Sequence, residues 1–387
     1  MSTISKRPPK VLQILPRLET GGLETGTVDV ARALVAAGWD SLVVSEGGAM
    51  VHQIKRIGAQ HIDLPVASKS PYHVWKNITA LETIIRECHV DLIHARSRMP
   101  AWSALYAAKR LGRPFVTTFH GTYNALTPIK KTYNSVMVRG AKVIAISEHI
   151  GRHIAKQYPQ FADRVSVIPR GIDVQIFDPN AVSAARMIKL SETWRLQDGQ
   201  SVILLPGRLT RWKGHKLLID ALVELDRKDI RCVMVGDTMS NASYKAEMEA
   251  YAARKDLKSV VQFVGGCNDM AAAYMLADVV VSASTDPEAF GRVAVEAQAM
   301  GRPVVATDHG GSVETVLNNK TGWLCDPLEP RSMARALENA LKLTVDQRVT
   351  IADIARCHVC ERYTVDRMTD QTITLYTEVL KEHDSKA

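Results

Sequence analysis

Short apolar runs rich in Val, Ile and Leu alternate with longer amphipathic segments along most of this chain. The segments at residues 25–37 and 78–87 have the spacing of apolar positions that is typical of surface helices. Short strands that alternate with helices pair in parallel, so we predict a doubly wound α/β domain in the first half. Its strands are expected at residues 11–15, 42–44, 62–64, 92–94, 115–118, 143–146 and 165–168.

The alternation starts again after residues 169–179, where Pro and Gly interrupt any regular element. A helical segment at residues 182–196 leads into the second series, and a last helical segment at 365–381 has no strand after it. A chain of 387 residues is too long for one ordinary core. We therefore predict two domains, residues 1–185 and 186–364. The strands of the second are expected at residues 202–205, 232–235, 260–264, 279–282, 304–306 and 323–325.

Composition is that of a folded, soluble protein. Hydrophobic residues make up 46% of the chain and charged residues 23%. No apolar run approaches the roughly 18 residues that cross a bilayer, and residues 1–10 lack the apolar core of a secretory signal. The six cysteines are scattered, mostly within apolar runs, which is typical of a reducing compartment. We expect a cytoplasmic location.

The formal net charge is +8, and many of the cations precede residue 143. A basic surface attracts anionic lipid, nucleic acid or phosphorylated substrates, and a merely solvated basic face is the alternative. The chain has no zinc-finger, helix-turn-helix or RNA-binding signature, so we expect no nucleic acid partner. An anionic membrane surface, bound peripherally, is the expected partner. The cations that precede residue 143 include Lys69, Lys76, Arg96, Arg98, Lys109, Arg110, Arg113, Lys130, Lys131, Arg139 and Lys142.

Two carboxylates, Glu288 and Glu296, stand eight positions apart on either side of Gly291. Glu288 follows the strand expected at residues 279–282, and Glu296 lies inside the helix expected at 292–300. Ligands of open α/β sheets bind at the carboxyl ends of the strands, and the free N–H groups of a helix start favour phosphate. Carboxylates form strong hydrogen bonds with sugar and ribose hydroxyls. The pair therefore predicts a site for a phosphorylated sugar compound, with a solvated helix cap as the alternative.

Arg208 and Lys213 lie on a glycine-bounded loop, Pro206 to Gly214, after the first strand of the second half. A guanidinium and an ammonium five residues apart are suited to binding a pyrophosphate. The alternative is a pair of surface cations without a ligand.

The first half carries further candidates at its strand ends. Gly21 and Gly22 follow the first strand and open a helix, where bare backbone N–H groups can lie beside a phosphate. The loop matches neither the dinucleotide-binding nor the Walker pattern. His120 directly follows another strand, and His94 and Arg96 lie at the end of a third. We predict that His120 serves the site, whereas His94 and Arg96 are candidates for acceptor contact or for a structural role.

These segments, in this order, resemble the retaining GT-B glycosyltransferases, the superfamily of bacterial glycogen synthases and of cell-envelope mannosyl- and glucosyltransferases. The resemblance implies two Rossmann-like domains facing across a cleft, with a C-terminal helix at about 365–387 that crosses back to the N-terminal domain. Residues 1–185 would bind the acceptor and residues 186–364 the nucleotide-sugar donor. The segment that starts at Arg170 is similar to the end of the family's N-terminal domain.

The resemblance also implies roles for individual residues. Backbone after the strand at residues 260–264 meets the nucleobase in the family, which makes Cys267 and its neighbour Asn268 candidates for the base pocket, with a plain turn as the alternative. The implied catalytic residues are His120, Arg208, Lys213 and Glu288. The implied donor-binding residues are Gly21, Gly22, Cys267, Phe290, Gly291 and Glu296.

The function implied is a metal-independent, retaining hexosyltransferase without a cofactor, using a UDP-sugar or a GDP-sugar. Its acceptor would be a cell-envelope glycan or glycolipid, lipopolysaccharide core above all. A nucleotide-sugar epimerase and a non-catalytic sugar-nucleotide binding protein of the same fold are the alternatives. Cys357 and Cys360 have the spacing of half a zinc site, but no second pair exists, so no metal site is expected.

Overall fold

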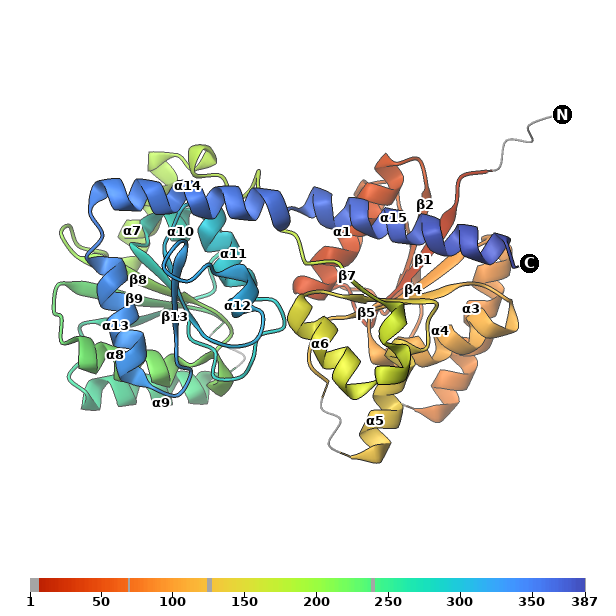
Figure 1. The fold of residues 1–387 in the computed structure, drawn as a ribbon, viewed down its shortest axis with the longest axis horizontal. Coiled ribbons are helices and arrows are strands. Elements are labelled where there is room, and N and C mark those ends of the chain that lie inside the picture. Colours follow the sequence, from red (N-terminus) through yellow and green to blue (C-terminus); the bar gives the residue numbers. More distant parts are fainter. Residues whose placement is uncertain (1–6, 69, 124–126, 238–240, 387) are drawn as a thin grey trace. The chain divides into compact units, whose positions relative to one another are not determined.

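The computed structural model describes residues 7–68, 70–123, 127–237 and 241–386. The chain forms two compact units (Figure 1). Unit 1 consists of Met1–Gly171 with Val365–Ala387, and unit 2 consists of Ile172–Thr364. No helix in the described part of the chain combines the length and the apolar character that a membrane span requires.

Unit 1 contains a seven-stranded parallel sheet of order β3-β2-β1-β4-β5-β6-β7. The order reverses between β1 and β4, which is the switch point where ligands of such sheets bind. The strands are β1 (Lys10–Ile14), β2 (Asp40–Ser45), β3 (Gln60–Asp63), β4 (Leu92–Ala95), β5 (Phe115–Phe119), β6 (Lys142–Ala145) and β7 (Val165–Val167). The helices are α1 (Gly22–Ala36), α2 (Val51–Arg56), α3 (Pro71–Glu87), α4 (Arg98–Arg110), α5 (Pro128–Asn134), α6 (Glu148–Gln157) and the C-terminal α15 (Val365–Asp384).

Unit 2 contains a six-stranded parallel sheet of order β10-β9-β8-β11-β12-β13, with its switch point between β8 and β11. The strands are β8 (Ser201–Pro206), β9 (Ile230–Val235), β10 (Val261–Gly265), β11 (Val279–Ser282), β12 (Val304–Thr307) and β13 (Gly322–Cys325). The helices are α7 (Ala184–Trp194), α8 (His215–Leu225), α9 (Ala242–Arg254), α10 (Met270–Leu276), α11 (Arg292–Ala299), α12 (Ser312–Thr315), α13 (Pro330–Leu341) and α14 (Val345–Arg362).

The central strands of both sheets are buried along nearly their whole length, as in β4, β5, β11 and β12. Strands covered on both faces need continuous apolar runs, and this is the pattern from which the strands were predicted. The predicted α/β class with two doubly wound parallel sheets is confirmed.

Helix α15 packs in unit 1, where it lies along α1 (Figure 1). Met368, Leu375 and Tyr376 share a buried apolar cluster with Val11 and Val30. The last helix of the chain therefore completes a core whose strands all lie in the first half of the sequence.

Unit 2 begins after Gly171, earlier than the boundary after residue 185 that the sequence predicted. The connecting segment packs on unit 2: the ring of Phe177 contacts Tyr274, and Asp178 pairs with Arg356 at 3.4 Å. Pro and Gly in the sequence show where regular elements end. They do not show on which unit the connecting segment packs, and these side-chain contacts place it with unit 2.

Candidate functional site

In unit 2, the loop after β8 is pressed against the end of β11. Gly214 has a φ of +73°, and a Cβ atom there would lie 1.7 Å from the carbonyl oxygen of Ala283. Only glycine fits this approach. It brings Lys213 over the loop that follows β11, whereas Arg208 is exposed and its side chain has no ion pair within the described residues.

Lys213 and Glu288 form an ion pair, with Nζ 2.5 Å from Oε1. Ser284 donates a hydrogen bond to the same oxygen at 2.6 Å. The two charged side chains are only 14% and 13% exposed, so the pair is shielded from water, where electrostatic interactions are stronger. The second oxygen of Glu288, Oε2, accepts no hydrogen bond from the described part of the chain. Glu288 thus has one oxygen fixed and one available to a ligand.

Glu296 lies in α11 and has partners on both oxygens. Arg292 donates from Nε to Oε1 at 2.6 Å, and the hydroxyl of Tyr274 donates to Oε2 at 2.8 Å. Burial and the neighbouring Glu296 raise the pKa of Tyr274 well above its usual value, so the hydroxyl stays protonated and donates. Each carboxylate oxygen can accept a second hydrogen bond, which leaves Glu296 able to bind a hydroxyl.

Gly291 caps α11 in the left-handed conformation, with a φ of +85°. Phe290 before it is buried, and a second glycine pair approaches this segment. A Cβ atom on Gly310 or Gly311 would lie 2.5 Å from backbone atoms of Glu288 or Phe290 respectively. The sequence analysis missed this pair. The signal was present, because two consecutive glycines in the loop after the strand at residues 304–306 repeat the pattern of Gly21 and Gly22.

In unit 1, Arg170 joins the glycine loop to His120. A Cβ atom on Gly22 would lie 2.0 Å from Nη1 of Arg170, and Nη2 donates to Nδ1 of His120 at 2.8 Å. Burial, with the positive charges of Arg170 and Arg96 and the neighbouring His94, lowers the pKa of His120 well below its usual value. His120 is therefore neutral, with Nδ1 as acceptor and the proton on Nε2. The contact between Arg170 and His120 was not predicted from the sequence.

His94 and Arg96 are committed to the interior of unit 1. Nδ1 of His94 lies 2.5 Å from the hydroxyl of Tyr376, and Nε2 lies 2.7 Å from the hydroxyl of Thr118. Arg96 is 4% exposed and donates to the side chain of Gln13 at 2.8 Å. These contacts favour the structural role over acceptor contact.

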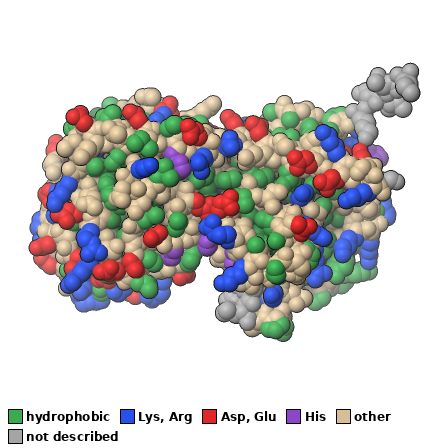
Figure 2. All heavy atoms as spheres, viewed as in Figure 1, with side chains coloured by type: hydrophobic (Ala, Val, Ile, Leu, Met, Phe, Trp, Pro, Cys, Tyr) green, Lys and Arg blue, Asp and Glu red, His purple; other side chains and the backbone are tan. Residues whose placement is uncertain are grey.

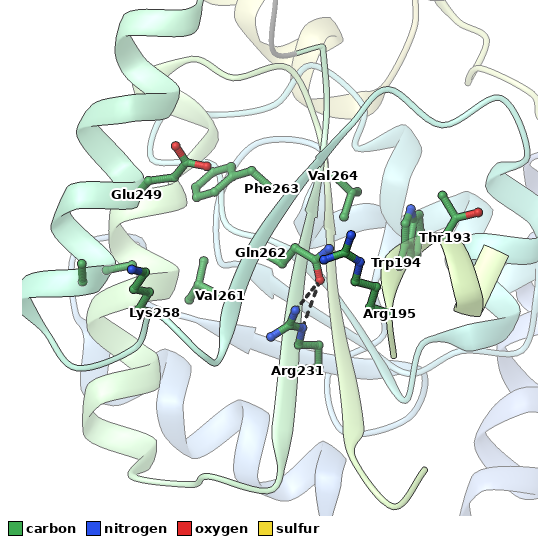
Figure 3. A pocket seen from close by; sticks show the side chains of 12 residues that line it. Thr193, Trp194, Arg195, Arg231, Glu249, Lys258, Val261, Gln262, Phe263 and Val264 are labelled. Carbon is green, nitrogen blue, oxygen red and sulfur yellow. Dashed lines mark hydrogen bonds between the residues drawn. The ribbon is translucent and has the colours of Figure 1, made fainter. Parts of the chain in front are cut away.

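Cys267 is half-buried after β10, and burial raises the pKa of its thiol. A cavity of about 660 Å³ lies along β10 beside Arg195, Arg231 and Gln262, and none of the candidate residues lines it (Figure 3). Among the described residues, no group of three or more His, Cys, Asp or Glu is arranged to hold a metal ion.

Comparison with known proteins identifies the family. Residues 20–176 match the model described as Glycosyltransferase Family 4, and residues 187–357 match the model described as Glycosyl transferases group 1. The crystal structure of a glycosyltransferase from Rickettsia africae ESF-5 is 35% identical, covers 97% of this chain and 100% of that chain, and has a TM-score of 0.91. The chain belongs to the glycosyltransferases.

Other relatives of this glycosyltransferase are more distant. Anabaena Alr3699/HepE, solved with UDP-glucose, is 24% identical, with 95% of this chain and 99% of that chain covered and a TM-score of 0.82. The D-inositol 3-phosphate glycosyltransferase of Jonesia denitrificans is 24% identical over 390 residues, which cover 92% of this chain and 91% of that protein. Together with the two parallel sheets, the structural neighbours confirm the GT-B type of two Rossmann-like domains.

His215, the residue after Gly214, predicts a pH dependence of stability. It is 1% exposed and lies edge-on to Tyr244, and burial lowers the pKa of its imidazole from 6.5 to about 4. The unfolded chain takes up this proton near pH 6.5, whereas the folded glycosyltransferase takes it up only near pH 4. The contribution is therefore complete above pH 6.5 and is lost as the pH falls toward 4, by roughly 3 kcal/mol in the free energy of unfolding.

Urea unfolding at pH 7 and pH 4.5 measures this loss. The variant His215→Asn should lose much less stability than the unmodified protein over that interval, although it is less stable at pH 7. His52→Asn, at an exposed histidine, is the control and should keep the full pH dependence. An unchanged slope in His215→Asn would contradict the assignment.

Proposed function

We propose that this glycosyltransferase is a retaining, metal-independent hexosyltransferase that takes its sugar from a UDP-sugar or GDP-sugar. The observation that carries the proposal is the ion pair of Lys213 and Glu288, which joins the loops after β8 and β11 on the two sides of the switch point, with Arg208 on the same loop as Lys213. Cations and a partly free carboxylate at such a point match a ligand that combines a diphosphate with sugar hydroxyls.

Arg208 and Lys213 are proposed to stabilise the departing diphosphate. Negative charge develops there as the bond between the anomeric carbon and the diphosphate oxygen breaks. Cations fixed in advance lower this barrier without reorganising, and removal of one such group costs about 3–4 kcal/mol in other enzymes. The same two side chains would do the work of a divalent metal, which is why we propose that none is required.

Glu288 and Glu296 are proposed to divide the donor between them. Glu288 would bind the sugar through its free Oε2, and Glu296 would bind the ribose through the remaining acceptor positions of its two oxygens. Arg292 and Tyr274 hold the carboxylate of Glu296 in place for this purpose. The backbone amides of Phe290 and Gly291 would meet the phosphates, and backbone near Cys267 would meet the base. In unit 1, Gly21 and Gly22 would approach a donor phosphate.

His120 is proposed to donate a hydrogen bond to a sugar hydroxyl. Its neutral ring accepts from Arg170 at Nδ1, so the one polar atom left for a ligand is the protonated Nε2. A ring with its lone pair already engaged is neither a nucleophile nor a base. The acceptor hydroxyl would therefore form the new bond on the face that the diphosphate leaves, and its proton would pass to the departing diphosphate oxygen.

The acceptor is proposed to be a cell-envelope glycan or a lipid-linked glycan, of which lipopolysaccharide core is the favoured case. This rests on the resemblance to envelope enzymes and on the surface of unit 1 considered below. UDP-glucose bound to Anabaena Alr3699/HepE supports a nucleotide-sugar donor. An epimerase or a non-catalytic binding protein would not release nucleoside diphosphate when an acceptor is added, whereas the transferase would.

Arg208→Ala and Lys213→Ala should each lower turnover by about 100-fold or more while the protein stays folded. The loop supplies a matched control, because Arg211 is exposed and pairs with Glu247 at 2.7 Å. Arg211→Ala should keep turnover within a few-fold. Release of nucleoside diphosphate under single-turnover conditions is the measurement, and EDTA should leave it unchanged. Near-normal turnover in both Arg208→Ala and Lys213→Ala would exclude their assignment.

Glu296→Gln and Glu288→Gln should differ in which ligand they weaken. Glu296→Gln should lower the affinity for the bare nucleoside diphosphate by about 10-fold, the loss expected for a hydrogen bond to a charged group. Glu288→Gln should spare that ligand and weaken only the sugar-bearing donor. Calorimetry with both ligands on each variant tests this, and equal losses for the bare diphosphate would remove the distinction.

An α-linked donor should give an α-linked product, as determined by NMR of the anomeric proton. Intact-mass analysis during turnover should find no glycosylated protein, because His120 has no lone pair for covalent attack. His120→Ala should slow transfer without changing the stereochemistry. A β-linked product would falsify retention, and a trapped glycosyl-enzyme would overturn the same-face mechanism.

A further inference from the structure

All large hydrophobic side chains that are exposed in the described part of unit 1 lie on three helices. They are Tyr72 and Trp75 on α3, Tyr106 on α4 and Ile129 on α5, with exposed fractions of 63%, 62%, 46% and 82%. A tryptophan so exposed is unusual for a monomeric surface, and exposed apolar groups that gather in one place mark interaction sites.

Side-chain contacts join the three helices into one surface. Ser103 on α4 donates to the carbonyl of Val74 on α3 at 3.0 Å. Trp102, also on α4, donates to the carbonyl of Tyr133 on α5 at 3.2 Å and stacks on Tyr106 with ring centroids 6.2 Å apart. We refer to Tyr72, Trp75, Tyr106 and Ile129 together as the aromatic patch.

The exposure of Ile129 is a property of a formed helix. Pro128 occupies the first turn of α5, where its missing N–H costs nothing, and Thr127 caps the helix by accepting from the N–H of Lys130 at 3.3 Å. The helix therefore presents Ile129 and Lys130 side by side, outward from unit 1.

The charges around the aromatic patch are of one sign. No Asp or Glu occurs between Asp91 and Glu148, a stretch that contains nine Lys and Arg, and none occurs between Asp63 and Glu82. Figure 2 shows lysine, arginine and hydrophobic side chains together at the end of unit 1 where Figure 1 places α5. The exposed cations in the described part of these segments are Lys76, Lys109, Arg110, Arg113, Lys130, Lys131 and Arg139.

Arg110 pairs with Glu82 at 2.9 Å, and Arg139 lies over the ring of Trp102 at 5.6 Å. The four exposed lysines around the patch, Lys76, Lys109, Lys130 and Lys131, have no ion pair within the described residues. Their charges are therefore available to an external anion. Aromatic and aliphatic groups alone would not favour an anionic partner over a neutral one.

We propose that the aromatic patch and its cations dock unit 1 on an anionic lipid bilayer. Trp and Tyr prefer the headgroup level of a bilayer, where the apolar part of the ring contacts lipid and its polar atom contacts water. Lysine side chains are long and flexible enough to reach the lipid phosphates. Ile129 enters the acyl boundary. This deepens the proposed lipid-linked acceptor by naming the surface that brings the enzyme to it, although docking itself is measured without acceptor or donor.

The chain contains a matched control. Ile188 and Lys189 on α7 of unit 2 repeat the Ile-Lys pair of α5, and both are exposed. The full-length protein, Ile129→Ser/Lys130→Glu and Ile188→Ser/Lys189→Glu are sedimented with vesicles of phosphatidylcholine alone or with one quarter phosphatidylglycerol, in 0.05 M or 0.5 M NaCl. Both double variants replace the same residue types and change the net charge by the same amount, and Ile188 is itself 57% exposed.

The unmodified protein should pellet with anionic vesicles at low salt and bind them at least 10-fold less at high salt. Each cation near the surface contributes about fivefold to the bound-to-free ratio, so Ile129→Ser/Lys130→Glu should lower that ratio at least 10-fold. Ile188→Ser/Lys189→Glu should stay within twofold. Brominated lipid should quench the fluorescence of Trp75, and Trp75→Phe should remove that part of the quenching.

Absence of pelleting, equal loss in the two double variants, or quenching of unchanged size in Trp75→Phe would overturn the proposal. Binding to single-stranded RNA in preference to vesicles would assign the patch to nucleic acid instead. Acceptor-dependent release of nucleoside diphosphate from UDP-sugars and GDP-sugars is measured in parallel on the same proteins. Failure of the proposed transfer reaction abolishes this release but not vesicle binding, whereas a failed docking surface does the reverse.

Discussion

The ion pair between Lys213 and Glu288 is the interaction on which the candidate donor site depends. Two charges that are shielded from water are stable only when they are paired with each other. Removal of one partner leaves an unpaired, poorly hydrated charge, which lowers the stability of the fold. The pair exists because Gly214 allows the loop after β8 to rest on the carbonyl of Ala283. The cationic and acidic parts of the site are therefore a single structural element, and neither can be repositioned without the other.

The sequence located the parts of this element but not their connections. Arg208, Lys213 and Glu288 follow apolar runs that are recognisable as strands, and the carboxyl ends of neighbouring parallel strands meet at one edge by geometry alone. The partners Ser284 and Tyr274 were not predicted. A hydrogen bond between residues 22 positions apart, as between Tyr274 and Glu296, depends on how two crossovers pack, and no periodicity in the chain reports that.

The two histidines at strand ends illustrate the same limit. His94 and His120 have equivalent places in the sequence, each just after or within a buried run. His94 is hydrogen-bonded to Tyr376, which lies 282 positions away. In His120, Arg170 occupies Nδ1, and Nε2 has no hydrogen-bond partner among the described residues. Whether a strand-end side chain serves the interior or a ligand is decided by such distant neighbours, so the pattern of apolar positions predicted the fold more completely than the roles of these residues.

The place of α15 has a consequence for synthesis of the protein on the ribosome. Unit 1 is discontinuous, and its buried cluster around Val11 and Val30 is completed by Leu375 and Tyr376, which are synthesised after all of unit 2. Unit 2 is continuous, so it can fold while the first 171 residues still lack their final helix. During that interval an apolar groove along α1 stays open to water and to chaperones. Termination of synthesis after residue 364 would leave that groove permanently uncovered, even though every described strand of both sheets had been made.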